Sequence, residues 1–92
     1  MALVKVPGKN KGDIMLFALS TCVWCGKTKK LLDDLGVAYT YEYVDLLTGA
    51  DRETAVKKIA AWNSSNSFPT MVINNEKCIV GFKEEEIRQA LK

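Results

Sequence analysis

The sequence contains no histidine, and several other features that would direct its interpretation are scarce. Without histidine, the chain lacks the commonest general base and the commonest metal ligand of proteins. Only three cysteines are present in 92 residues, so the dense, even set of cysteines that staples small secreted domains is missing. The net charge is +2, with 13 basic and 11 acidic residues. A nucleic-acid-binding domain would carry a stronger and more clustered basic field.

Long apolar runs are absent as well. The longest run, residues 14–19, is far shorter than the ~20 residues that cross a bilayer. The segment 1–13 lacks the apolar core of about 7–15 residues that a secretory signal peptide requires. We therefore expect a cytoplasmic monomer that binds neither membranes nor nucleic acid.

The length of the chain allows one compact domain. Pro7, Gly8 and several lysines without any hydrophobic period predict a flexible N-terminal segment over 1–13, followed by the domain over 14–92. The apolar run 14–19 predicts a strand buried on both faces. Next, the hydroxyls of Ser20 and Thr21 are expected to cap a helix over 23–35. Its inward face and its C-terminal stop are predicted as Thr28, Leu31, Leu32, Leu35 and then Gly36.

The second half of the chain continues the alternation of strands and helices. Residues 37–44 alternate tyrosines with polar residues and predict a strand, and 51–62 predict a helix with Val56, Ile59 and Ala60 on one side. Strands over 70–73 and 77–80 flank an asparagine turn, and a last helix covers 83–91. The order β-α-β-α-β-β-α predicts an α/β fold with a mixed four-stranded sheet flanked by helices.

The chemistry of the chain is expected at Cys22 and Cys25, in the run Cys22-Val23-Trp24-Cys25 at the head of the first helix. Residues spaced i, i+3 lie on the same side of the first turn, near enough to form a disulfide. Unpaired N–H groups and the helix dipole stabilise a thiolate there. We expect Cys22 to be the nucleophile and the more shielded Cys25 to be the resolving thiol.

Two other interpretations of the cysteines are open. Free cysteines are often merely packed in a core. A structural zinc site needs four ligands, so Cys78 could be a third, with a carboxylate or a second subunit as the fourth. Redox chemistry is favoured because a strand, a helix start and Cys-x-x-Cys follow in this order. We expect no metal and no resident cofactor.

Trp24, Trp62 and Cys78 each have either a core or a surface position. Trp24 lies between the two cysteines, where an exposed, substrate-facing aromatic is expected. Trp62, at the end of the second helix, is expected in the core. Cys78 lies in a short apolar strand, where packing is expected to suppress its reactivity.

The cysteine run and the later run Ser67-Phe68-Pro69-Thr70 together resemble the glutaredoxin family of the thioredoxin superfamily, over residues 14–91. The resemblance implies a thioredoxin fold in which Pro69 is a cis-proline against the active-site disulfide. It also implies that the backbone of Phe68 pairs with an extended substrate and that Thr70 flanks the same groove.

The run Val80-Gly81-Phe82-Lys83 lies where glutathione-using glutaredoxins carry Gly-Gly followed by Asp, and only Gly81 matches. The basic residue that those proteins place before the first cysteine is missing, and Val23 replaces their usual proline. A non-proline at that position together with Gly81-Phe82 is similar to NrdH-redoxins, which take electrons from a flavoprotein or similar reductase. The substrate-binding residues that the resemblance implies are Trp24, Phe68, Pro69, Thr70, Gly81 and Phe82.

The resemblance thus implies a dithiol thiol–disulfide oxidoreductase of the protein-disulfide-reductase type. Its substrates would be disulfides of proteins or of small molecules, and its donor would be a flavoprotein or similar disulfide reductase rather than glutathione. A second interpretation is an iron–sulfur or metal-binding glutaredoxin-like carrier. Some glutaredoxins hold a [2Fe–2S] cluster between two subunits with the help of glutathione, and the altered Gly81 turn disfavours that form.

Overall fold

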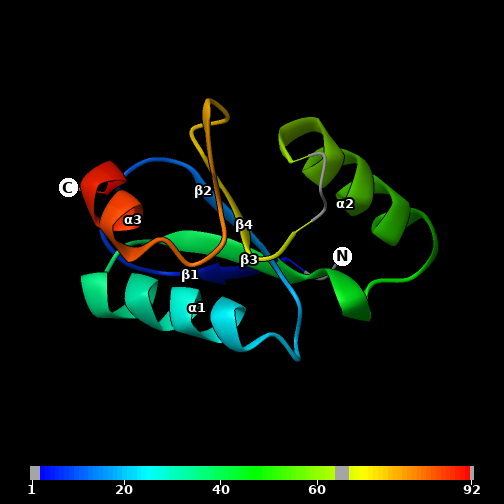
Figure 1. Cartoon of the computed structure of the whole chain (residues 1–92), viewed down its shortest axis with the longest axis horizontal. Coiled ribbons are helices and arrows are strands. Elements are labelled where there is room, and N and C mark those ends of the chain that lie inside the picture. Colours follow the sequence, from blue (N-terminus) through cyan, green and yellow to red (C-terminus); the bar gives the residue numbers. More distant parts are fainter. Residues whose placement is uncertain (1–2, 64–66, 92) are drawn as a thin grey trace.

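The computed structural model describes residues 3–63 and 67–91, which form a five-stranded mixed sheet with helices on both faces (Figure 1). The strand order across the sheet is β1-β3-β2-β4-β5. The central strand β2 is parallel to β3 and antiparallel to β4, and the two outer pairs are antiparallel. The strand bounds are β1 Val4–Val6, β2 Ile14–Ala18, β3 Tyr39–Tyr43, β4 Thr70–Ile73 and β5 Lys77–Val80.

The helices divide between the two faces of the sheet. Helices α1 (Val23–Leu35) and α3 (Glu84–Ala90) lie on one face, and α2 (Gly49–Trp62) lies on the other (Figure 1). A short 3-10 helix, η1 (Val44–Leu46), leads from β3 toward α2. The alternation of side chains along β2 separates two cores accordingly. Leu16 packs in the cluster with α1 and α3, and Phe17 in the cluster with α2.

The thioredoxin-like α/β arrangement agrees with the prediction, but the sheet has five strands rather than four. The extra strand β1 pairs antiparallel with β3, in the register Val4–Tyr41. Two further backbone hydrogen bonds, from Lys9 to Gly36 and from Ala38 to Lys9, tie the same segment to the domain. The strand escaped prediction because three residues beside Pro7 are too few to show a period. The domain boundary at residue 14 stays a prediction, although residues 4–6 join the sheet.

Helix α1 has the bounds and the inward face that its sequence predicts. Thr28, Leu31 and Leu32 are buried, and Leu35 is half-buried against the same cluster. Gly36 follows in the left-handed conformation with φ of 69°, and its N–H donates to the carbonyl of Asp33. That conformation favours glycine, which explains why the helix ends at this residue.

The predicted face of α2 is wrong by one position. Ala55 and Ile59 are the buried residues of this helix, whereas Val56 is 40% exposed and Ala60 is also exposed. Alanines stand on several sides of α2 and blur its apolar stripe, so the sequence alone did not fix its rotation. Trp62 is half-buried against the cluster under α2, in partial agreement with its expected core position.

The C-terminal half otherwise matches its predicted elements. Asn74 and Asn75 both have φ of 54° and form the turn between β4 and β5, as asparagine's tolerance of positive φ predicts. Ile87 and Leu91 anchor α3 in the core. Within the described ranges, no helix has the length and apolar character that crossing a membrane requires.

Candidate redox site

Cys22 is itself the N-cap of α1, in agreement with its predicted place at the head of the helix, whereas the predicted capping by the hydroxyls of Ser20 and Thr21 is wrong. Its backbone is extended, with φ of −88° and ψ of 116°. The Sγ atom of Cys22 accepts a hydrogen bond from the backbone N–H of Cys25 over 3.2 Å. This sulfur therefore replaces the usual capping oxygen and stands at the positive end of the helix dipole.

Cys25 lies one turn further into α1 and is only 2% exposed. Burial, reinforced by the hydrogen bond with the Cys22 side chain, raises the pKa of the Cys25 thiol to about 12. A thiol with this pKa is protonated at neutral pH. The two cysteines, both free thiols in this structure, thus differ in exposure and in electrostatic environment, as their predicted roles require.

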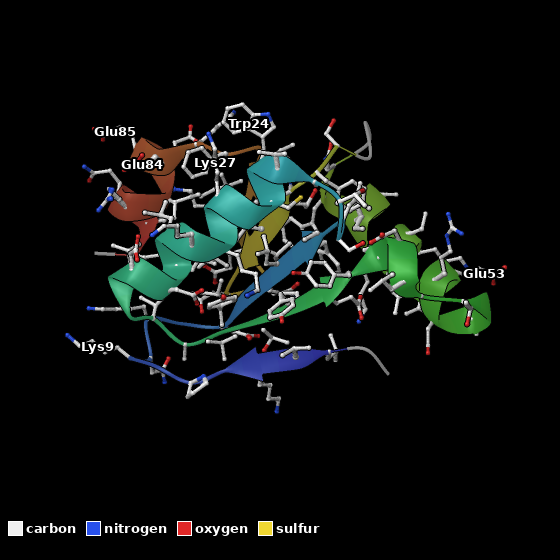
Figure 2. The ribbon with its side chains drawn as sticks, turned by 90° about the horizontal axis from the view of Figure 1, so that it is seen from below. Lys9, Trp24, Lys27, Glu53, Glu84 and Glu85 are labelled. Carbon is white, nitrogen blue, oxygen red and sulfur yellow. The ribbon has the colours of Figure 1, made fainter. Side chains whose placement is uncertain are left out.

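Trp24 is exposed beside the cysteines, as predicted. It retains 55% of its accessible surface, and Val23 retains 70%. The Trp24 ring stacks on Phe82 with 6.0 Å between centroids and 26° between planes. The ammonium of Lys27 lies 4.5 Å from the centre of the same ring, and Figure 2 shows Trp24 and Lys27 together at the outer side of α1. The contact of Trp24 with a substrate stays a prediction.

The peptide bond between Phe68 and Pro69 is cis, which confirms the conformation that the family resemblance implied. The carbonyl of Pro69 accepts a hydrogen bond from the N–H of Gly81 over 2.8 Å. Gly81 has φ of 85°, a conformation that favours glycine. The two loops that carry Pro69 and Phe82 are therefore joined through backbone. Phe68, Phe82 and Cys22 are partly buried against the cluster that contains Cys25.

The resemblance implied that Thr70 flanks the substrate groove, and this placement stays a prediction. Its side chain is fully buried, at 0% exposure. The hydroxyl donates to the carbonyl of Ser67 at 2.7 Å and accepts from Nδ2 of Asn63 at 3.3 Å. Because residue 70 points to the α2 side of the sheet, it holds the start of the Phe68–Pro69 loop from within and offers no side chain to a groove.

Asp45 is a member of this site that the sequence analysis did not single out. One carboxylate oxygen accepts from the N–H of Ser20 at 2.9 Å, and the other accepts from the Ser20 hydroxyl at 2.5 Å. These bonds lower the pKa of Asp45 below its ordinary value. Ser20 follows β2 and Asp45 follows β3, and these two strands are parallel. Because the carboxyl ends of parallel strands meet at one edge of a sheet, the sequence could have predicted that the two residues lie close together.

Cys78 lies apart from the other two cysteines. It pairs across β4 and β5 with Val72, which belongs to the cluster under α2, whereas Cys25 belongs to the cluster under α1. Burial raises the pKa of the Cys78 thiol, in line with its expected packing. Across the described ranges 3–63 and 67–91, no cluster of three or more histidine, cysteine, aspartate or glutamate residues is suited to hold a metal ion.

A cavity of about 560 Å³ opens on the face of the sheet that α2 covers only in part. Its wall includes Phe17, Glu42 and Trp62. None of the predicted redox-site residues lines it, so the cavity and the cysteine pair are separate features of the molecule.

The comparisons with known proteins agree with this geometry. A family model described as Glutaredoxin matches residues 14–79. The structure is similar to that of a glutaredoxin from Methanosarcina mazei, with 54% identity and a TM-score of 0.92, over 99% of this chain and 88% of the other. It is also similar to methanoredoxin from Methanosarcina acetivorans, with 55% identity and a TM-score of 0.89, over 91% of this chain and 88% of the other.

More distant relatives extend the similarity. A glutaredoxin from Ricinus communis is 30% identical over 67 residues, a match that spans 73% of this chain but only 64% of the relative's own length. The NrdH-redoxin of Escherichia coli is 19% identical with a TM-score of 0.69, over 84% of this chain and 92% of the other, and at that identity it shares the fold alone. With the Cys22–Cys25 pair at the head of α1, the chain belongs to the glutaredoxin family of thiol oxidoreductases within the thioredoxin superfamily.

Proposed function

We propose that this protein is a dithiol thiol–disulfide oxidoreductase that reduces protein or low-molecular-weight disulfides through Cys22 and Cys25. One observation carries the proposal: the Cys22 sulfur caps α1 and accepts the N–H of Cys25. This hydrogen bond and the helix dipole stabilise negative charge on an accessible sulfur. The partner thiol is buried and protonated directly behind it.

The reaction has two exchange steps. The Cys22 thiolate attacks one sulfur of the substrate disulfide, a mixed disulfide forms, and the other substrate sulfur leaves as a thiolate. The Cys25 thiol then loses its proton and attacks the Cys22 sulfur. This second step forms the Cys22–Cys25 disulfide and releases the remaining substrate thiolate, so that two electrons have passed to the substrate. The departing thiolate is a suitable acceptor for the Cys25 proton.

The surface around Cys22 supports a protein disulfide as one class of substrate. Val23 and Trp24 expose apolar area next to the sulfur, and Phe82 fixes the Trp24 ring by stacking. Exposed aromatic and aliphatic side chains of this kind mark interaction surfaces. The Phe68 backbone beside Pro69 is the proposed pairing site for an extended substrate segment.

The run Gly81-Phe82-Lys83 favours an electron donor other than glutathione. The N–H of Gly81 is already bonded to the carbonyl of Pro69, and Phe82 and Lys83 stand where glutathione-using relatives carry Gly and Asp. We propose a flavoprotein or similar disulfide reductase as the donor. We further propose that the protein works as a monomer in the cytoplasm, where thiols are kept reduced.

The function is tested by the reduction of insulin in the presence of dithiothreitol, with the wild-type protein compared with Cys22→Ser. The wild type should accelerate precipitation of the insulin B chain, and Cys22→Ser should match the dithiothreitol blank. Cys78→Ser is the matched control, because Cys78 lies on the other face of the sheet, and it should retain wild-type activity. Equal activity of wild type and Cys22→Ser would refute the proposal.

The donor is tested separately, by supplying NADPH either with glutathione and glutathione reductase or with a thioredoxin-type reductase. We expect faster NADPH oxidation with the thioredoxin-type reductase. Faster turnover with glutathione would reject the proposed donor and leave the dithiol mechanism standing.

A further inference from the structure

The two hydrogen bonds between Ser20 and Asp45 join the ends of the two parallel strands. Ala18 of β2 is in register with Tyr43 of β3. Ser20 and Asp45 each lie two residues beyond this pair, at the same edge of the sheet. Each oxygen of the carboxylate accepts one hydrogen bond from Ser20, so the contact fixes both the backbone and the side chain of that residue.

Ser20 lies inside the turn that delivers Cys22 to the start of α1. The N–H of Cys22 donates to the carbonyl of Leu19 over 3.2 Å, which closes a tight turn through Ser20 and Thr21. The N–H of Gly26 donates to the carbonyl of Cys22, the first helical bond beyond the cap. Asp45, which lies in η1 after the end of β3, thus anchors the turn over residues 19–22 through Ser20.

From this arrangement we infer that Asp45 is a positioning residue of the redox site: through Ser20 it fixes the turn 19–22 and holds the Cys22 sulfur at the N-cap of α1. The inference rests on the proposed function only in naming Cys22 as the reacting group. A displaced N-cap sulfur would lose alignment with the N–H of Cys25, and hydrogen bonds weaken steeply with poor alignment.

The role assigned to Asp45 rests on its hydrogen bonds, and its charge is a separate property. The hydrogen bonds from Ser20 keep its carboxyl pKa low, and Arg52 adds a smaller contribution in the same direction. Asp45 is therefore ionised at neutral pH. Its negative charge is also one of the lesser causes of the raised pKa of Cys25, after burial and the hydrogen bond with Cys22.

The experiment separates the geometry of the tether from its charge. Asp45→Asn retains an oxygen that accepts from the Ser20 N–H and an NH₂ that donates to the Ser20 hydroxyl, but it removes the charge. Asp45→Ala removes the two hydrogen bonds and the charge. Ser20→Ala removes only the hydrogen bond from the Ser20 hydroxyl. Asp34→Asn is the control, since it deletes an exposed carboxylate near the far end of α1.

The readout is the rate of Cys22 alkylation by iodoacetamide between about pH 5 and about pH 9, with all thiols reduced beforehand and Cys22 followed by peptide mass spectrometry. We expect Asp45→Ala to slow alkylation about tenfold at neutral pH, because the sulfur is no longer held in place. Ser20→Ala should slow it about threefold, and Asp45→Asn should stay within about threefold of the wild type. Asp34→Asn should not change it.

A wild-type alkylation rate in Asp45→Ala would overturn the inference, whatever the thermal stability of that variant. An Asp45→Asn variant as slow as Asp45→Ala would also overturn it, because charge rather than placement would then govern the sulfur. If Asp45→Ala does not fold, Ser20→Ala and Asp45→Asn decide by the same criteria. Alkylation does not depend on turnover, so a wild-type protein that fails to reduce insulin would reject the proposed function and leave this test intact.

Discussion

The backbone N–H of Cys25 points at the Sγ of Cys22 over 3.2 Å, and this one contact makes two chemically similar residues unequal. Cys22 gains a donor that stabilises negative charge. Cys25 carries its own thiol into the core, where burial raises its pKa to about 12. The two cysteines differ because Cys22 is the N-cap of α1, whereas Cys25, three residues later, lies inside the helix.

Alkylation should therefore follow a fixed order. Burial raises the pKa of Cys25, so its thiol is protonated at neutral pH, and its side chain is almost fully buried. We expect iodoacetamide to modify Cys22 at least about a hundredfold faster than Cys25, as measured by peptide mass spectrometry of the reduced protein. Equal rates at the two cysteines would contradict the asymmetry.

Trp24→Ala tests the surface beside the cysteines. Because Trp24 is more than half exposed, its removal should change the free energy of unfolding by less than about 1 kcal/mol. The KM for insulin should rise about three- to tenfold, as for an aromatic interface residue. Val56→Ala, an exposed apolar truncation on α2, is the control and should leave KM unchanged. A wild-type KM in Trp24→Ala would remove Trp24 from the substrate surface.

Thr70→Val distinguishes an internal role from a substrate-binding role. The change deletes the buried hydroxyl that bonds Ser67 and Asn63, and it should lower the free energy of unfolding by about 1–2 kcal/mol. The KM should change less than about twofold, because no part of this side chain is exposed. Thr54→Val, at an exposed position of α2, is the matched control. Unchanged stability with a raised KM would restore Thr70 to the substrate groove.

Stability should fall in alkaline solution. Burial is the first cause of a raised pKa at Cys25, Tyr39 and Cys78. Raised values mean that the folded chain holds these protons more tightly, so their contribution is fully present below the ordinary thiol pKa of 9.0 and is lost as the pH rises toward about 12. We expect roughly 1–2 kcal/mol to be lost between about pH 9 and about pH 10.5.

Urea unfolding with a phosphine reductant present measures that loss. Cys25→Ser should show a shallower decline, because Tyr39 and Cys78 keep their raised pKa values. A free energy of unfolding that stays constant over this range would contradict the assignment.

The sequence predicted the elements where one short pattern determined them. The helix over Val23–Leu35 was found because Leu31 and Leu32 lie on one face and Gly36 ends it. The cis conformation at Pro69 came from the family resemblance, since an X–Pro bond is cis in only about 5–6% of cases.

Features that depend on tertiary contact were not predicted. The pairing of β1 with β3 joins residues that are 33 to 37 positions apart through only three strand positions. The bond of Ser20 to Asp45 requires the register of two parallel strands, and Ser20 was instead assigned to the helix cap by local propensity. Thr70 is buried because its side chain lies on the face of β4 that packs toward α2. All four residues of β4 are buried, so the sequence shows no alternation that would tell the two faces apart.

The most direct test of the account is a trapping experiment with Cys25→Ser. This variant retains the Cys22 nucleophile but lacks the resolving thiol. Incubated with a disulfide substrate, it should accumulate one mixed disulfide per chain, and peptide mass spectrometry should place it on Cys22. The wild type should accumulate the intramolecular Cys22–Cys25 disulfide instead. Absence of the adduct, or its appearance on Cys78, would contradict the assignment of Cys22 as the attacking thiol.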